Sequence, residues 1–361
     1  MKTIPELLCE RELPELLIMR DGTPVTRDNW PARRAELLDI LQQELYGVTP
    51  APCPVEGKII QTDERYCAGK VRHDTVDLTL HTPYGDHTFP VQLFRPKANP
   101  NAPVFLHICF RPDFPDRYSP IEEITDHGFA FAMFDYNTVA TDDGDFTNGL
   151  GGLYVGDRKR RPHEWGKLGM WAYAASRVLD WLETIDGIDA KKVTVTGHSR
   201  LGKTALWCAA QDERFFCGIS NDSGCGGAAI ERGKVGERTE RITEVFPFWF
   251  CPRYKDYSGH AELLPFDHHF IVACVAPRYC YIASAEEDLW ADPASEYLSA
   301  AAGSAAYELL GLPGVLPVCE TMPTAPAEFH DGTIGYHVRK GLHYYGREDW
   351  LRQMAFLEAR V

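Results

Sequence analysis

The sequence predicts an α/β protein with a doubly wound, mostly parallel sheet flanked by helices, a three-layer sandwich. Short apolar runs indicate strands, and segments with a helical period separate the later ones. The later strand runs are continuously apolar, as in a sheet that is covered on both faces. Strands that alternate with helices favour a parallel sheet. The eight expected strands are residues 76–80, 88–94, 104–110, 129–134, 193–197, 215–220, 279–285 and 316–320.

The expected helices repeat apolar residues every three or four positions. Residues 28–48 keep their leucines on one side and stop at Gly47, and residues 163–185 show the same period. No repeat, low-complexity tract or linker interrupts the pattern, so residues 1–361 are expected to form one domain. Its expected parts are an N-terminal helical segment over about 1–50, an insertion over about 230–265 near the carboxyl edge of the sheet, and helices directly after Ser199, at 294–310 and at 347–359.

Composition narrows the classes of partner. The 361 residues carry a formal net charge of −15 without a long basic run, which argues against a nucleic-acid partner. No apolar run is long enough to cross a membrane, and the N-terminus shows no signal peptide. The eleven cysteines are odd in number, contain no C-x-x-C pair and often lie in apolar runs. This usage predicts reduced thiols in a cytoplasmic protein. The sequence gives no signal for an oligomeric state.

Residues 192–203 read "KVTVTGHSRLGK", an apolar strand that runs into a glycine-bounded turn with a serine. The hydrolase elbow is G-x-S-x-G, whereas here Arg200 follows Ser199 and the second glycine, Gly202, comes one residue late. One interpretation is a nucleophile exposed at a strand-to-helix turn, where helix N–H groups point at a developing oxyanion. The other is that the serine only caps the helix.

Possible partners of the serine follow the later strands. Asp222 comes after the sixth expected strand, Asp288 after the seventh, and His330, His337 and His343 after the eighth. This order of serine, acid and histidine is that of the α/β hydrolases. His343 is the favoured base because its loop begins with glycine just before the last helix. Either aspartate could orient the imidazole and stabilise its charged form.

Other polar residues near the motif have two interpretations each. Arg200 is either a surface arginine or a group that stabilises an oxyanion or grips a substrate oxygen. Lys203 lies one helical turn beyond the serine and could face the same cleft. The adjacent histidines of "FDHHF" at 266–270 lack metal-site spacing, so we expect a structural role there, and His107 is expected in the core. No metal or cofactor is expected.

Motifs along the whole chain resemble those of carbohydrate esterase family 15, the glucuronoyl esterases, including bacterial members labelled acetyl xylan esterase-like. The most specific is G-x-S-R-x-G-K followed by an acid-S-G-x-G-G motif. The segments that carry the resemblance are "NWPARRAELLDILQQELYG", "DDGDFTNGLGGLY", "EWGKLGMWAYAASRVLDWLE", "GHSRLGK", "NDSGCGGAA", "FPFWF", "FDHHFIVACVAPR", "DLWADP" and "GYHVRKGLHYYGREDW".

The resemblance implies an α/β-hydrolase fold and assigns roles to single residues. Ser199 falls on the nucleophile, Arg200 on the oxyanion-hole arginine and His343 on the base. The acid falls on Asp222 or Asp288, and Asp222 stands where glutamate is common in the family. The family cleaves esters between a 4-O-methyl-glucuronoyl carboxyl group and a lignin alcohol without a metal or cofactor. Residues assigned to substrate binding are Lys203, Trp290 and Glu237.

The sequence departs from the family at three places. Fungal members have a disulfide between cysteines that precede the nucleophile and follow the base, where this chain has His198 and Tyr344. Members that act on plant polymer are usually exported, yet no signal is found here. The loop "CFRPDFP" replaces the asparagine and glycine that are common there, so this wall of the site is expected to differ.

The expected function is therefore serine carboxylic-ester hydrolysis of a small carbohydrate ester, in the first place a glucuronoyl ester, through an acyl-enzyme. Two alternatives remain from the sequence. One is a deacetylase of acetylated xylo-oligosaccharides or other small sugar esters, which uses the same triad with another acyl pocket. The other is a catalytically inactive hydrolase-like binding protein. A metallohydrolase is a more distant fourth.

Overall fold

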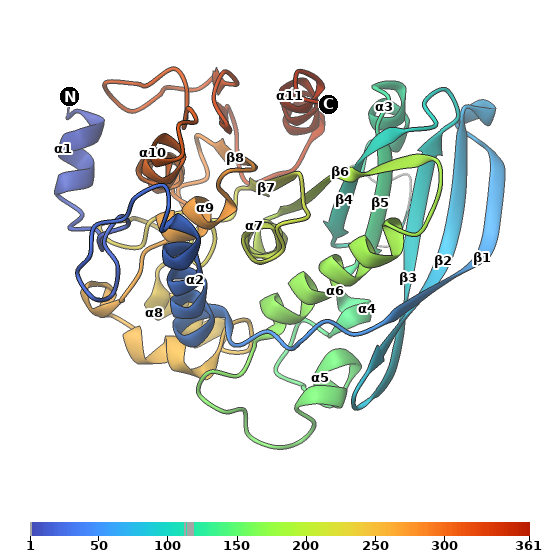
Figure 1. Cartoon of the computed structure of the whole chain (residues 1–361), viewed down its shortest axis with the longest axis horizontal. Coiled ribbons are helices and arrows are strands. Elements are labelled where there is room, and N and C mark those ends of the chain that lie inside the picture. The colour runs from blue at the N-terminus through green and yellow to red at the C-terminus, as the bar shows by residue number, and fades with distance from the viewer. Residues whose placement is uncertain (1, 112, 114–118) are drawn as a thin grey trace.

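The computed structural model describes residues 2–111, 113 and 119–361 (Figure 1). Within these residues, ten strands form one sheet in the order β1-β2-β3-β5-β4-β6-β7-β8-β10-β9. The strands are β1 Val55–Tyr66, β2 Val71–Thr82, β3 Gly85–Pro96, β4 Ala102–Cys109, β5 Ala130–Asp135, β6 Ile188–His198, β7 Cys217–Asn221, β8 Tyr279–Ala285, β9 Ala327–Phe329 and β10 Ile334–Arg339.

The centre of the sheet is parallel, and its two sides are antiparallel. Strands β5, β4, β6, β7, β8 and β10 pair in parallel, with Thr194 of β6 opposite Phe105 of β4 and Cys217 of β7. Strands β1 to β3 form an antiparallel meander, and β9 pairs antiparallel with β10. After β4 the chain places β5 on one side and β6 on the other. Such a reversal opens a crevice at the carboxyl ends of the strands, where ligands bind in open α/β sheets.

Helices cover both faces of this sheet. Figure 1 shows α3 and α11 on one side and α6 and α7 on the other. Each side has its own apolar core, with Trp350 of α11 fully buried in one, and Trp171 of α6 and Trp207 of α7 in the other. The α-helices are α1 Ile4–Cys9, α2 Trp30–Leu41, α3 Ile121–Asp126, α4 Tyr136–Val139, α5 Gly149–Tyr154, α6 Lys167–Leu182, α7 Arg200–Gln211, α8 Thr239–Val245, α9 His269–Val275, α10 Pro293–Leu309 and α11 Arg347–Glu358.

Most of the predicted elements are confirmed. The first seven expected strands coincide with β2 to β8, and the helical patterns coincide with α2, α6, α7, α10 and α11. All eight residues of β4 are buried, as a strand that is covered on both faces requires. The apolar positions of α6 lie in the core because their helical spacing brings them to the face that packs on the sheet.

The eighth expected strand, residues 316–320, is wrong. These residues form no strand, and Val318 is 78% exposed. Pro317 lacks the N–H that a central strand must donate, which explains why an apolar run here does not join the sheet. The last parallel strand is β10, which contains His337, so His330 precedes it and only His343 of the three candidate histidines follows it.

Strand β1 was not predicted from the sequence. It is an edge strand in which Ile59 and Ile60 are about half exposed and charged residues alternate without an apolar period. Because β1 pairs with β2 over most of its length, backbone hydrogen bonds rather than apolar burial hold it in place.

The two segments expected beside the main sheet both contain helices. Residues 1–50 contain α1, α2 and a π-helical turn at Gln42–Tyr46, and residues 230–265 contain α8 and two 3₁₀ turns. All eleven cysteines lie among the described residues as thiols outside any disulfide, and most are buried. In the described ranges no helix is both long and apolar enough to span a membrane. The single domain and the cytoplasmic location stay predictions.

Candidate active site

Ser199 lies at a tight turn between β6 and α7, at the carboxyl edge of the sheet. Its backbone has φ 58° and ψ −126°, a left-handed conformation that costs a residue with a Cβ about 1–3 kcal/mol. The serine occupies the N-cap position of α7, but its side chain makes no capping hydrogen bond among the described residues. The capping interpretation therefore does not account for the hydroxyl, and the strained turn presents it at the crevice.

Close packing explains both glycines of the motif. A Cβ on Gly197 would lie 2.2 Å from the Leu201 carbonyl oxygen, and one on Gly202 would lie 2.9 Å from the Asn221 carbonyl oxygen. The Ser199 N–H also donates to the Asn221 carbonyl at 2.8 Å. Gly202, the second glycine, therefore lies where α7 packs closely against β7. The turn is still an elbow although this glycine comes one residue late.

His343 and Asp288 form a direct hydrogen-bonded pair beside this turn. His343 Nδ1 lies 2.6 Å from Asp288 Oδ2, although the residues follow different strands, β10 and β8. Burial alone would raise the pKa of Asp288, but the hydrogen bond and charge of His343 outweigh it, so the pKa is lowered. The aspartate is thus ionised and accepts from Nδ1–H, which leaves Nε2 as the basic nitrogen. The His343 ring centroid lies 4.4 Å from that of His198, the residue before the serine.

Asp222 also lies beside His343, but its pKa is shifted in the opposite direction to that of Asp288. An oxygen of Asp222, one of Asp288 and a ring nitrogen of His343 all lie within 4.8 Å of one another. Asp222 is 1% exposed, and its Oδ1 has no hydrogen-bond partner among the described residues. Burial raises the pKa of Asp222 well above its ordinary value, the nearby carboxyls of Glu296 and Asp349 add to this, and Arg339 opposes it. The structure therefore brings both candidate acids to His343, but only Asp288 is hydrogen bonded to it.

Glu296 of α10 holds the loop that carries Asp222. Its carboxylate accepts the Gly224 N–H at 2.9 Å and the Ser284 hydroxyl at 2.6 Å. Sequence reasoning missed this residue because its neighbours come from β8 and from the loop after β7. Burial raises the pKa of Glu296 from 4.5 to about 7.

This shift predicts a pH-dependent stability. The folded chain keeps the Glu296 proton while the unfolded chain loses it near pH 4.5, so the stabilisation is present below pH 4.5 and is lost as pH rises to about 7. The expected contribution to the slope is about −1.4 kcal/mol of unfolding free energy per pH unit. Glu296→Gln should flatten the curve by this amount in urea titrations between these pH values. An unchanged slope would show that Glu296 is ionised throughout.

Arg200 contacts one carboxylate and three aromatic rings. Its guanidinium pairs with Asp142 and lies 4.8 Å from the ring centroid of Trp249, with Phe110 and Phe246 also within 6 Å. The Trp249 indole N–H donates to the other oxygen of the same aspartate at 2.6 Å. Arg200 is therefore not a freely solvated surface arginine. Its Nε–H is buried and has no partner among the described residues, while the side chain as a whole is 28% exposed.

The three residues assigned to substrate binding lie together. Lys203 is buried, donates from Nζ to the Ser223 carbonyl and lies 3.6 Å from a carboxylate oxygen of Glu237. The Glu237 N–H donates to the Trp290 carbonyl at 2.9 Å, and Trp290 is 55% exposed. A cation, a carboxylate and an exposed indole thus lie near one another, with Lys203 one helical turn from Ser199. Such groups bind sugar hydroxyls and sugar faces.

Four other histidines singled out in the sequence make structural contacts. His268 Nε2 accepts the Gly226 N–H at 3.0 Å, and His269 bonds to the Pro14 carbonyl at 3.3 Å, as the structural interpretation of "FDHHF" predicted. His107 is buried in the core, where burial lowers its pKa to about 3. His337 bonds to Asp349 rather than to Asp288. The predicted change in the wall at 109–115 lies partly outside the described residues.

The sheet order, the elbow after β6 and a histidine–aspartate pair from the last two parallel strands define an α/β hydrolase. A family profile described as "Glucuronyl esterase, fungi" matches residues 87–311. Carbohydrate esterase MZ0003, from an unknown prokaryotic organism, is 33% identical over 381 residues, covering 94% of this chain and 87% of that protein. The chain therefore belongs to the glucuronoyl esterase family, carbohydrate esterase family 15, whose members are carboxylic-ester hydrolases, and the resemblance is confirmed.

Solved structures agree with this assignment. The glucuronoyl esterase from Solibacter usitatus superposes with a TM-score of 0.89 at 34% identity, covering 96% of this chain and 97% of that one. A serine-to-alanine mutant of the glucuronoyl esterase from Sporotrichum thermophile, in complex with methyl 4-O-methyl-β-D-glucopyranuronate, superposes with a TM-score of 0.67 at 25% identity. That alignment covers 82% of this chain and 78% of the mutant.

Proposed function

We propose that this protein hydrolyses glucuronoyl esters of carbohydrates through an acyl-enzyme on Ser199. The observation that carries the proposal is the 2.6 Å hydrogen bond between His343 and Asp288 at the edge where the strained Ser199 turn lies. A serine hydroxyl needs a base, and the base needs a group that fixes its tautomer and stabilises its charge. The three residues supply these three roles.

The reaction takes two steps. His343 Nε2 removes the Ser199 proton as the oxygen attacks the ester carbonyl, and Asp288 stabilises the imidazolium that forms. The imidazolium then protonates the leaving alcohol, and the acyl group stays on the serine. Water, deprotonated by the same nitrogen, attacks the acyl-enzyme and releases the uronic acid.

The oxyanion has two sources of stabilisation in this proposal. The first N–H groups of α7 begin directly after the serine, at the positive end of the helix dipole. The partly exposed guanidinium of Arg200 supplies a charge-assisted donor from the adjacent residue. Asp142 and Trp249 limit the positions that this guanidinium can take.

The identity of the acyl group is proposed from the three residues assigned to substrate binding. Lys203 and Glu237 offer a donor and an acceptor to sugar hydroxyls, and the exposed Trp290 offers a face to the ring. The Sporotrichum thermophile complex, in which a relative holds a methyl glucuronate ester, supports a uronoyl rather than an acetyl group.

Side-by-side turnover tests this choice. We expect kcat/KM for methyl 4-O-methylglucuronate to exceed that for acetylated xylose by at least about 100-fold, since an acetyl group makes none of the hydrogen bonds that Lys203 and Glu237 offer to a uronoyl ring. Initial rates at matched enzyme concentration measure both values. Faster hydrolysis of acetylated xylose would contradict the proposal and favour the deacetylase alternative.

A further inference from the structure

Arg339 is a buried cation that the proposed mechanism does not use. It is the last residue of β10, and its side chain is 6% exposed. One terminal nitrogen donates to the Lys340 carbonyl at 3.0 Å and to the Leu342 carbonyl at 3.1 Å, and the other donates to the Tyr344 carbonyl. These carbonyls belong to the loop that carries His343 and include those on either side of it.

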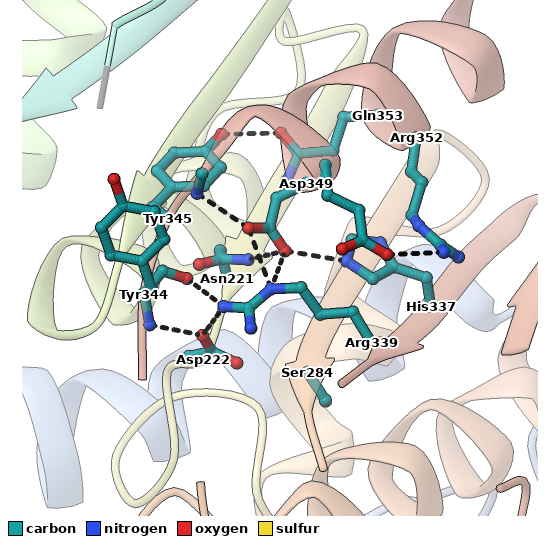
Figure 2. Close-up of polar contacts among 12 residues, drawn as sticks. Asn221, Asp222, Ser284, His337, Arg339, Tyr344, Tyr345, Asp349, Arg352 and Gln353 are labelled. Atoms are coloured by element: carbon teal, nitrogen blue, oxygen red, sulfur yellow. Dashed lines mark hydrogen bonds and ion pairs between the residues drawn. The ribbon is translucent and has the colours of Figure 1, made fainter. Parts of the chain in front are cut away.

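Asp349 of α11 fixes the guanidinium from the opposite side. Its two oxygens accept from Arg339 Nε at 2.9 and 3.1 Å (Figure 2). The same carboxylate accepts the Gly346 N–H at 2.8 Å and contacts His337 Nε2 at 3.0 Å. Asp349 is itself fully buried. The arginine therefore cannot move without breaking contacts to both the loop after β10 and the start of α11.

The same network reaches the nucleophile turn. Asn221 Nδ2 donates to Asp349 at 3.3 Å, and Asn221 Oδ1 lies 2.7 Å from His198 Nδ1. The Ser199 N–H donates to the Asn221 carbonyl. Hydrogen bonds thus connect Arg339 and Asp349, which hold the loop of His343, to the turn that carries Ser199.

Asp222 makes longer contacts to the same arginine and the same loop. Its Oδ2 lies 3.4 Å from Arg339 Nη2 and 3.5 Å from the Tyr344 nitrogen (Figure 2). The arginine is the cation that lies between the two buried carboxyls of Asp222 and Asp349.

We propose that Arg339 is a positioning residue for the catalytic base: it orders the loop of residues 340–345 around its guanidinium and so fixes His343 opposite Ser199. The inference rests on the proposed function, because it gives a role to the support of the same triad. A loop has no hydrogen-bond ladder of its own, and its inward carbonyls need donors. Arginine supplies a rigid fork of five N–H groups, whereas lysine supplies one point charge.

The test compares Arg339→Lys with the wild-type enzyme in two assays. One is turnover of methyl 4-O-methylglucuronate, and the other is the second-order rate at which a fluorophosphonate labels Ser199. We expect kcat and the labelling rate to fall together by about 100-fold, since a displacement of about 1 Å at a catalytic group has this effect. KM should change by less than about threefold, because the substitution leaves Lys203, Glu237 and Trp290 unchanged.

Arg352→Lys is the matched control, and Asp349→Asn is the second variant. Arg352 lies on the neighbouring α11 but pairs with Glu328 and Glu348, outside the loop, so both rates should be retained. Asp349→Asn weakens the hold on Arg339 Nε and should lower both rates in the same way, which keeps the inference testable if Arg339→Lys does not fold.

Two results would overturn the inference. One is a lower melting temperature of the folded Arg339→Lys protein with unchanged kcat and labelling, which would make the arginine merely structural. The other is a rise in KM alone, which would place it in substrate binding. If the wild-type enzyme is labelled at Ser199 but does not hydrolyse the glucuronate ester, the proposed function fails, and the labelling rates still decide the role of Arg339.

Discussion

Ser199→Ala is expected to lower kcat for methyl 4-O-methylglucuronate by about 10⁶-fold, the loss seen when a triad nucleophile is removed from a serine hydrolase. The physical reason is that the hydroxyl oxygen forms the acyl bond, which an alanine methyl group cannot form. The turn should survive, because its shape depends on the packing of Gly197 and Gly202 rather than on a serine hydrogen bond. Initial-rate assays at high enzyme concentration measure the residual activity.

Ser176→Ala is the control for this variant. Ser176 lies on α6 and contacts Cys208, so its loss should leave kcat unchanged. Thermal melts of both variants should match the wild-type protein within a few degrees. Wild-type turnover by Ser199→Ala would remove the serine from the mechanism.

The two aspartates should differ strongly although both lie beside His343. Asp288→Asn is expected to lower kcat by about 10⁴-fold, because an amide at this position favours the wrong imidazole tautomer and cannot stabilise the imidazolium. Asp222→Asn should cost less than about tenfold, or about 1.4 kcal/mol of activation free energy. The raised pKa of Asp222 favours its neutral form, and a neutral carboxyl resembles an amide in shape and charge. Steady-state kinetics on the same ester measure both variants.

Two results would contradict the expected difference between the two aspartates. If Asp222→Asn loses as much activity as Asp288→Asn, the Asp222 carboxylate is ionised in the working enzyme and shares the orienting role. If only Asp222→Asn loses activity, the 2.6 Å contact of Asp288 is not the one that supports catalysis.

The fold and the order along the chain of the three proposed triad residues could be predicted from the sequence because both depend on local patterns. The apolar run into the "GHSRLGK" turn determined β6 and α7, and the helical period determined α6. The edge strand β1 carried no apolar period, and Pro317 made a loop resemble a strand. The structure still has His343 in a loop between the last parallel strand and the last helix, as the glycine before it and the helical pattern after it predicted.

The choice between the acids could not be predicted because it depends on distance and burial. Asp222 and Asp288 both follow parallel strands, and only the structure shows that one is hydrogen bonded to the imidazole while the other is buried with an unpartnered oxygen. Asp142 and Arg339 were missed for a related reason. Their partners lie far away in the sequence or on backbone carbonyls, which carry no residue-type signal.

A crystal structure of Ser199→Ala with methyl 4-O-methylglucuronate bound would test the central claim most directly. We predict that the ester carbonyl carbon lies about 3–3.5 Å from the position of the missing hydroxyl. The carbonyl oxygen should face Arg200 and the start of α7, the methoxy oxygen should face His343, and the sugar hydroxyls should face Lys203 and Glu237. An ester group that lies away from residue 199, or a sugar that does not contact Lys203 and Glu237, would contradict the account.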